Sequence, residues 1–128
     1  MNPDFVNIST VLEIHSLSLE RFGGLDGVRS QELLESAVEQ PRMTFGGVFL
    51  HEDLFVMAAA YLFHIVKNHP FLDGNKRTGL GVALAFLDRN DLPIEQPSLR
   101  LYDATMAVAE GKLDKAGIAA ILRELAGV

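Results

Sequence analysis

The sequence contains no cysteine and no tryptophan, and basic residues are few: 11 Lys and Arg stand against 17 Asp and Glu, a formal net charge of -6. The absence of cysteine excludes disulfides, a thiolate nucleophile and thiolate metal ligands, and it suits a reducing cytoplasm. The shortage of cations argues against a broad basic face of the kind that binds nucleic acid. We therefore expect no direct nucleic-acid binding, and any local group of cations becomes informative.

Long apolar runs are also missing. The longest, Leu54 to Phe63, is interrupted by His64 and is shorter than a membrane span. The first ten residues, MNPDFVNIST, lack the basic and apolar regions of a signal peptide. With 128 residues the chain has the length of one ordinary globular domain, so we expect a single domain over 1–128, cytoplasmic and without membrane contact.

The helical pattern predicts an all-α fold. Thr10 and Glu13 have capping-box spacing and predict a first helix that ends at Gly23-Gly24. Its expected apolar stripe comprises Val11, Ile14, Leu17 and Leu19. Ser30 is expected to cap a second, short helix that Pro41 ends.

The segment 43–50 breaks the helical period. Two strand-like triplets, Met43 to Phe45 and Val48 to Leu50, flank Gly46-Gly47, which can adopt the positive φ of a tight hairpin. This hairpin, here called the flap, either offers a strand edge to a target or serves only as a connector. The sequence does not decide between these two interpretations.

Four further helices complete the expected fold. Asp53 caps a helix that reaches about Asn68, and another runs from Lys76 to about Asn90; both are apolar on nearly every face, as buried helices are. Two amphipathic helices follow, over Ser98 to Glu110 and Asp114 to Leu125, with Gly111 between them at a helix-ending position.

The loop between the two buried helices, within NHPFLDGNKRTG, carries the chemistry. Pro70 disfavours helical geometry at His69 and so leaves this imidazole on the rim of the loop. Asp73-Gly74 is a turn dipeptide, and Asn75 is expected to act as N-cap, which puts Lys76, Arg77 and Thr78 in the first turn. Helix N-termini favour acidic residues, so two cations here indicate a bound anion.

Free N–H groups, a glycine and two cations together form a site of the kind that holds phosphates. Asp73 could complete the oxygen shell of Mg²⁺, His69 could take a proton from a hydroxyl, and Lys76 with Arg77 could stabilise phosphoryl charge. Each feature alone has an ordinary structural explanation: a dipole partner, a turn, a solvated surface. Their order and spacing together favour the functional interpretation.

That order closely resembles a known signature. His69 to Arg77 reads HPFLDGNKR, similar to the H-P-F-x-[DE]-G-N-G-R of the Fic/Doc family. The segment RFGGLDGVRS and the stretch from Pro41 to Gly47 extend the resemblance over nearly the whole chain. It implies a compact helical Fic fold that uses ATP and Mg²⁺. By this resemblance His69 activates the target hydroxyl, Asp73 holds the metal, and Gly74, Asn75 and Arg77 bind nucleotide phosphates.

Lys76 departs from the common Fic form, in which AMP-transferring relatives have glycine. Its side chain occupies space that a phosphate could otherwise share with bare backbone. Members of the death-on-curing (Doc) type also have lysine here, and this resemblance implies transfer of the γ-phosphoryl group to a threonine of elongation factor Tu, which arrests translation. Adenylylation of a protein hydroxyl remains an alternative, and so does a catalytically inactive helical interaction module.

Many Fic enzymes contain an inhibitory helix of pattern [ST]-x-x-x-E-[GN], and this sequence has no full match. Inhibition is therefore expected from a separate antitoxin whose disordered tail folds onto the chain. Two other features are given structural interpretations. His64 is expected to be a satisfied core histidine, and Gly23, Gly24 and Gly27 are expected to end a helix.

Overall fold

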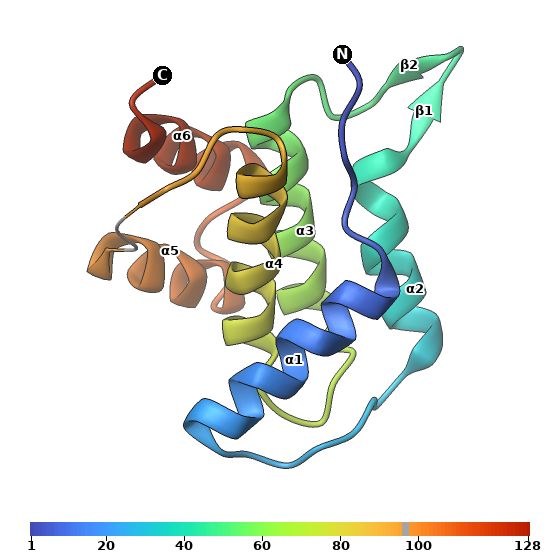
Figure 1. Ribbon diagram of the computed structural model, residues 1–128, viewed down its shortest axis with the longest axis vertical. Coiled ribbons are helices and arrows are strands. Elements are labelled where there is room, and N and C mark those ends of the chain that lie inside the picture. Colours follow the sequence, from blue (N-terminus) through green and yellow to red (C-terminus); the bar gives the residue numbers. More distant parts are fainter. Residues whose placement is uncertain (96–97) are drawn as a thin grey trace.

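The computed structural model describes residues 1–95 and 98–128. These residues form six α-helices, one short 3-10 helix and a two-stranded hairpin, which confirms the all-α fold with a small flap (Figure 1). The elements are α1 (Ile8–Phe22), α2 (Gln31–Glu39), η1 (Gln40–Arg42), β1 (Thr44–Phe45), β2 (Val48–Phe49), α3 (Leu54–Asn68), α4 (Asn75–Arg89), α5 (Leu99–Ala109) and α6 (Lys115–Ala126). None of the helices in the described ranges is long and apolar enough to cross a membrane.

The centre of the fold is α3, which packs against α2, α4, α5 and α6 (Figure 1). Its sequence is apolar nearly all round, so every face can be buried against a neighbour. The closest neighbour is α4, where Gly79 faces α3: a Cβ at this position would lie 3.2 Å from the carbonyl oxygen of Leu62. Glycine therefore lets the two helices approach closely, and this fixes the ends that the functional loop joins.

Side-chain caps are present at three helices, and two of them, at Ser30 and Asp53, were predicted from sequence. The side chains of Ser30, Asp53 and Asp114 each accept a backbone N–H in the first turn of α2, α3 and α6. At α1 the prediction was wrong, because the helix begins at Ile8 and its N-cap is Asn7, whose side chain accepts the N–H of Thr10. A better cap three residues upstream therefore sets the start of this helix.

The predicted inner face of α1 was also partly wrong. Its buried residues are Val11, His15 and Ser18, whereas Leu17 is 61% exposed. The reason is tertiary: this face of α1 lies over the loop between α3 and α4, where polar groups find hydrogen-bond partners. Those partners, rather than hydrophobicity alone, select the face that is buried.

The flap forms as predicted. Thr44 pairs with Phe49 and Phe45 with Val48, and Gly46 and Gly47 have φ of 58° and 79°, the positive values of a two-residue hairpin turn. The hairpin projects from the helices, and Phe45 is 81% exposed (Figure 1). The flap therefore presents apolar side chains to solvent.

Candidate active site

The loop His69–Gly74 reverses the chain between α3 and α4 and lies beside α1 and the 23–30 segment (Figure 1). His69 closes α3 in the left-handed conformation with φ 53°, and its N–H donates to the carbonyl of Ile65 at 3.2 Å. Phe71 is fully buried and anchors the middle of the loop. The imidazole of His69 thus stays on the exposed rim, as the sequence predicted.

Asn75 does not cap α4 as predicted; it is the first helical residue, and Gly74 takes the N-cap position with φ 79°. The buried amide of Asn75 closes the loop instead: Oδ1 accepts the N–H of Phe71, and Nδ2 donates to the carbonyl of Phe71, both at 3.0 Å. With its side chain held inside the loop, Asn75 can offer a ligand its backbone N–H.

The same amide sets the tautomer of His69. Because the N–H of Phe71 can only donate, Oδ1 of Asn75 must face it, and Nδ2 then donates to Nδ1 of His69 at 3.1 Å. In the neutral ring the proton therefore resides on Nε2. At rest, His69 presents an N–H to the solvent side of the loop.

Asp73 is held as a carboxylate. Its Oδ2 accepts the N–H of Leu25 at 3.2 Å, and its Oδ1 accepts the N–H of Gly74 at 2.9 Å. These two backbone hydrogen bonds, followed by the charges of Arg77 and Lys76, lower the pKa of Asp73 below its usual value. The group is therefore ionised at neutral pH, and its remaining lone pairs are available to a cation.

Within the part of the chain that the structure describes, no side chain caps the first turn of α4. The first backbone hydrogen bond of α4 is made by the N–H of Thr78, which donates to the carbonyl of Gly74 at 2.9 Å. The N–H groups of Asn75, Lys76 and Arg77 precede it and have no partner within the helix. This helix end, with its partial positive charge, is suited to bind an anion.

The two cations extend to different sides of the helix start. Lys76 is exposed and lines a depression of about 340 Å³ together with His69 and Asn75. Arg77 turns toward α1, where its Nε donates to Oγ of Ser18 at 3.1 Å and its Nη2 donates to the carbonyl of Gly23 at 3.2 Å. The sequence predicted that the two cations act together on phosphoryl charge; the structure brings Lys76 near His69 and anchors Arg77 to α1.

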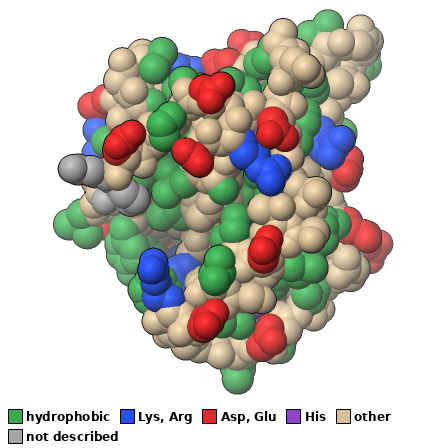
Figure 2. Space-filling model, in the orientation of Figure 1, with side chains coloured by type: hydrophobic (Ala, Val, Ile, Leu, Met, Phe, Trp, Pro, Cys, Tyr) green, Lys and Arg blue, Asp and Glu red, His purple; other side chains and the backbone are tan. Residues whose placement is uncertain are grey.

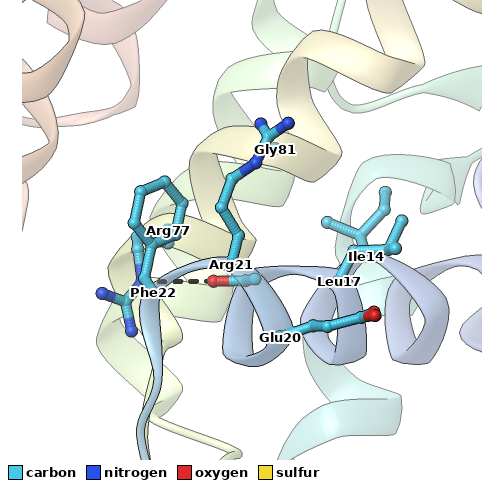
Figure 3. Close-up of a pocket in the computed structure, with 8 residues that line it drawn as sticks. Ile14, Leu17, Glu20, Arg21, Phe22, Arg77 and Gly81 are labelled. Carbon is cyan, nitrogen blue, oxygen red and sulfur yellow. Dashed lines mark hydrogen bonds between the residues drawn. The ribbon is translucent and has the colours of Figure 1, made fainter.

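On the α1 side, Arg77 borders a groove of about 590 Å³ between α1 and α4 (Figure 3). The guanidinium lies over the ring of Phe22, with 5.1 Å from its carbon to the ring centroid. Phe22 and Leu17 are both 61% exposed, although they line this groove. It is therefore an open surface that is largely apolar, with Arg21 and Glu20 also in its lining and Arg77 at the edge nearest the loop.

Among the described residues, the surface outside the loop has no extended basic patch on the face shown in Figure 2. On the face shown in Figure 2, acidic and apolar side chains are interspersed, and Lys and Arg lie in a few separate places. Among residues 1–95 and 98–128, no three His, Asp or Glu side chains cluster so that they could hold a metal ion unaided. A cation at Asp73 would take its remaining ligands from water or from a bound molecule.

Comparison with known proteins identifies the family. The sequence model of the Fic/DOC family matches residues 5–87. The chain is 34% identical over 119 residues to "Protein kinase doc" of Escherichia phage P1, across 91% of each protein. It is 40% identical over 108 residues to "Toxin Doc" of Mycolicibacterium smegmatis, across 83% of this chain and 81% of the relative. The chain belongs to the Fic/Doc family.

The Fic/Doc match covers α1 to α3 and α4 as far as Leu87, and therefore includes the whole loop with its supports. One support that the sequence analysis missed is His15 of α1, which is buried and stacks on Phe71 with 3.8 Å between ring centroids. Its Nε2–H donates to the carbonyl of Asp73 at 2.8 Å. The signal was a histidine one helical turn after Val11, on the face that proved to be buried.

A second missed support is the 23–30 segment, which sequence analysis took as helix-ending glycines. Beyond the contact of Leu25 with Asp73, the carbonyl of Gly27 accepts the N–H of Leu72 at 3.0 Å, and Arg29 binds the far end of the loop. Gly24 has φ 122°, and a Cβ there would lie 2.7 Å from Oδ2 of Asp73. These glycines therefore admit the loop as well as ending α1.

His64 has the partner expected of a core histidine. Its Nε2 lies 3.0 Å from Nζ of Lys115, which is also 3.2 Å from Nε2 of His51. Since the ammonium can only donate, both imidazoles accept at Nε2. This junction ties the chain before α3 and the middle of α3 to the start of α6, away from the loop.

Proposed function

We propose that this chain is a Doc-like toxin that transfers the γ-phosphoryl group of ATP to a threonine hydroxyl of a translation factor and so arrests translation. The names of its relatives, a protein kinase and a toxin, support this proposal. Elongation factor Tu is the target that the resemblance to Doc proteins implies. An antitoxin supplied in trans is the corresponding partner.

The observation that carries the proposal is the position of one carboxylate and one imidazole around an uncapped helix start. Asp73 is ionised, His69 is exposed on the loop rim, and Lys76 shares a depression with His69. The free N–H groups of α4 face the same end of the helix. Together these groups supply what phosphoryl transfer requires from a protein: positioning and charge stabilisation.

In the proposed step, the oxygen of the threonine hydroxyl attacks the γ-phosphorus of ATP. The new O–P bond forms as the bond between the γ-phosphorus and the β–γ bridging oxygen breaks, and ADP leaves. The hydroxyl proton passes to His69, while Lys76 and Arg77, with the N–H groups at the start of α4, stabilise negative charge on the phosphate oxygens.

Asp73 fits a role in holding Mg²⁺. It is ionised and fixed by two backbone N–H groups, and Mg²⁺ is commonly held by one or two carboxylates together with waters and substrate phosphates. When bound, the ion would neutralise charge on the phosphates. Asp73 is the carboxylate in this loop, so we propose that the nucleotide supplies further ligands.

The resting tautomer of His69 has a consequence for this step. Since Nδ1 accepts from Asn75, the neutral ring carries its proton on Nε2 and is a donor there. We propose that substrate binding breaks the contact with Asn75, so that the ring proton moves to Nδ1 and leaves Nε2 free to act as base. In ¹⁵N spectra of labelled histidine, Mg²⁺ and a non-hydrolysable ATP analogue should shift His69 away from the Nε2–H tautomer; an unchanged tautomer would contradict this step.

The reaction type is tested with ATP labelled separately at the α and γ positions and incubated with a bacterial lysate. We expect γ-label on a protein of the size of the translation factor, and no label with His69→Ala, folded as judged by circular dichroism. Appearance of α-label on the target would establish adenylylation instead. Absence of both labels with the unaltered chain would favour the inactive interaction module.

Regulation by an antitoxin is supported by the groove between α1 and α4. Leu17 and Phe22 expose apolar surface beside Arg77, a suitable surface for a segment that folds on binding. Expression of the chain alone should arrest bacterial growth, whereas the His69→Ala variant should not. Normal growth with the unaltered, soluble chain would remove the basis for an antitoxin.

A further inference from the structure

The backbone at His69 is held in an unfavourable conformation. Its φ of 53° is one of two positive values among non-glycine residues in the described ranges, the other being at Asp91. A left-handed conformation is costly for a residue with a Cβ and persists where surrounding contacts determine it. Pro70 disfavours the helical alternative at His69, but it does not select the left-handed one. Some further contact must fix the peptide that positions the imidazole.

That contact comes from the guanidinium of Arg29. Its Nε donates to the carbonyl of His69 at 2.7 Å, and its Nη2 donates to the carbonyl of Asn68 at 2.9 Å. Two donors of one rigid, planar group therefore bind two successive carbonyls at the end of α3. The positive charge also lies at the negative end of the helix dipole, where cations are favourable.

The main chain of the same segment binds the next carbonyl. The N–H groups of Arg29 and Ser30 both donate to the carbonyl of Pro70, at 2.6 and 3.1 Å. Arg29 and Ser30 thus donate hydrogen bonds to three consecutive carbonyls, those of residues 68 to 70, which lie about forty positions later in the chain. This contact fixes the peptide planes on both sides of the His69 Cα.

We propose that Arg29 is a positioning residue for His69: its side chain holds the peptide that aims the imidazole at the reacting hydroxyl. The inference rests on the proposed function, and it adds a residue outside the loop to the set that the reaction needs. Arg29 does not itself contact the proposed phosphate site at the start of α4, because both of its donors are directed at backbone carbonyls of α3 and the loop.

Contacts other than the Arg29 side chain also hold the end of α3 and the loop in place. The end of α3 is also secured by the N–H of His69 bonded to Ile65 and by Nδ2 of Asn68 bonded to the carbonyl of Leu33. The main-chain bonds to Pro70 survive any side-chain change except to proline. Since Arg29 is exposed, its truncation should leave the fold largely intact and relax the geometry at His69.

The test compares Arg29→Ala and Arg29→Lys with a matched control, Arg100→Ala, which removes another exposed, hydrogen-bonded arginine far from the loop. Three quantities are measured on each chain: Mg²⁺·ATP affinity by calorimetry, the rate of label transfer from ATP, and the ¹⁵N spectrum of labelled histidine. We expect Arg29→Ala to reduce the transfer rate by about tenfold to a hundredfold, the scale of a misplaced catalytic group. Its ATP affinity should match that of Arg100→Ala.

The spectrum distinguishes positioning from folding. In Arg29→Ala, His69 should lose the single Nε2–H tautomer that its contact with Asn75 fixes, while His15, His51 and His64 keep their signals. Arg29→Lys can donate to only one carbonyl at a time, so its His69 spectrum should be intermediate between those of the unaltered chain and Arg29→Ala. If Arg29→Ala does not fold, Arg29→Lys provides the same readouts.

Three results would overturn the inference: full transfer rate in the Arg29 variants, a loss of ATP affinity that accounts for the whole fall in rate, or an unchanged His69 signal in Arg29→Ala. Failure of the proposed function is separable. If the unaltered chain transfers no label, that proposal fails, yet the histidine spectra still test Arg29, because an unchanged His69 signal in Arg29→Ala would refute its positioning role.

Discussion

Gly24 and Asp73 show at the scale of single residues how closely the loop is packed. A Cβ at Gly24 would lie 2.7 Å from the Asp73 carboxylate, and the φ of 122° is itself unfavourable for other residues. Gly23 offers a matched control, since its φ of 77° is also positive but a Cβ added there would meet nothing within 4 Å. Comparing alanine variants at these two glycines therefore separates the cost of backbone strain from the effect of displacing Asp73.

We expect both Gly24→Ala and Gly23→Ala to lose about 1–3 kcal/mol of unfolding free energy from backbone strain. Only Gly24→Ala should also weaken Mg²⁺-dependent ATP binding, because the added methyl group must push the carboxylate away from the N–H of Leu25. Urea unfolding and calorimetry measure the two effects. Equal ATP affinity in both variants would show that this carboxylate position does not matter.

His15 gives a second prediction at this scale. The variant His15→Phe keeps an aromatic ring for stacking on Phe71 but removes the donor to the carbonyl of Asp73. A buried acceptor left without its partner costs about 1–3 kcal/mol, and because this carbonyl is only partly buried, urea unfolding should show a loss at the lower end of that range. A variant as stable as the unaltered chain would mean that water or another donor replaces the imidazole.

At the scale of elements, the junction of α3 and α6 makes stability depend on pH. Burial, and then the charge of Lys115, lower the pKa of His64 from its usual 6.5 to about 4 and lower that of His51. Between these pH values the unfolded chain binds more protons than the folded chain. The stabilisation is therefore fully present above pH 6.5 and is lost as the pH falls toward 4.

Thermal unfolding measured from pH 7.5 down to 4.5 should show this decline. In His64→Gln the amide oxygen can still accept from Lys115 but does not titrate, so the melting temperature should fall less steeply with pH. The same slope in both chains would show that other groups dominate the acid sensitivity.

Sequence patterns predicted the elements better than their contacts. Helices with a local cap, at Ser30, Asp53 and Asp114, were located correctly because the donor and acceptor lie three residues apart. The inner face of α1 was not, because His15 is buried by a partner 58 positions away, at Asp73. Local periodicity does not contain this information.

At the scale of the whole molecule, the 23–30 segment, α1 and α4 converge on one loop. The sequence predicted the loop residues His69, Asp73, Lys76 and Arg77, because two cations at a helix start indicate an anion site and the motif resembles the Fic/Doc signature. It assigned Asn75 to a cap, and it gave no role to Arg29. Both errors have the same cause. The amide of Asn75 and the guanidinium of Arg29 bind backbone atoms that come within reach only when the chain is folded.

The central claim is that the start of α4 holds the phosphates of ATP beside His69. A crystal structure with Mg²⁺ and a non-hydrolysable ATP analogue tests it most directly. We expect the phosphates against the N–H groups of residues 75–77, the metal on Asp73, and the terminal phosphate within reach of His69 and Lys76. A nucleotide bound elsewhere, with its phosphates away from this helix start, would contradict the account.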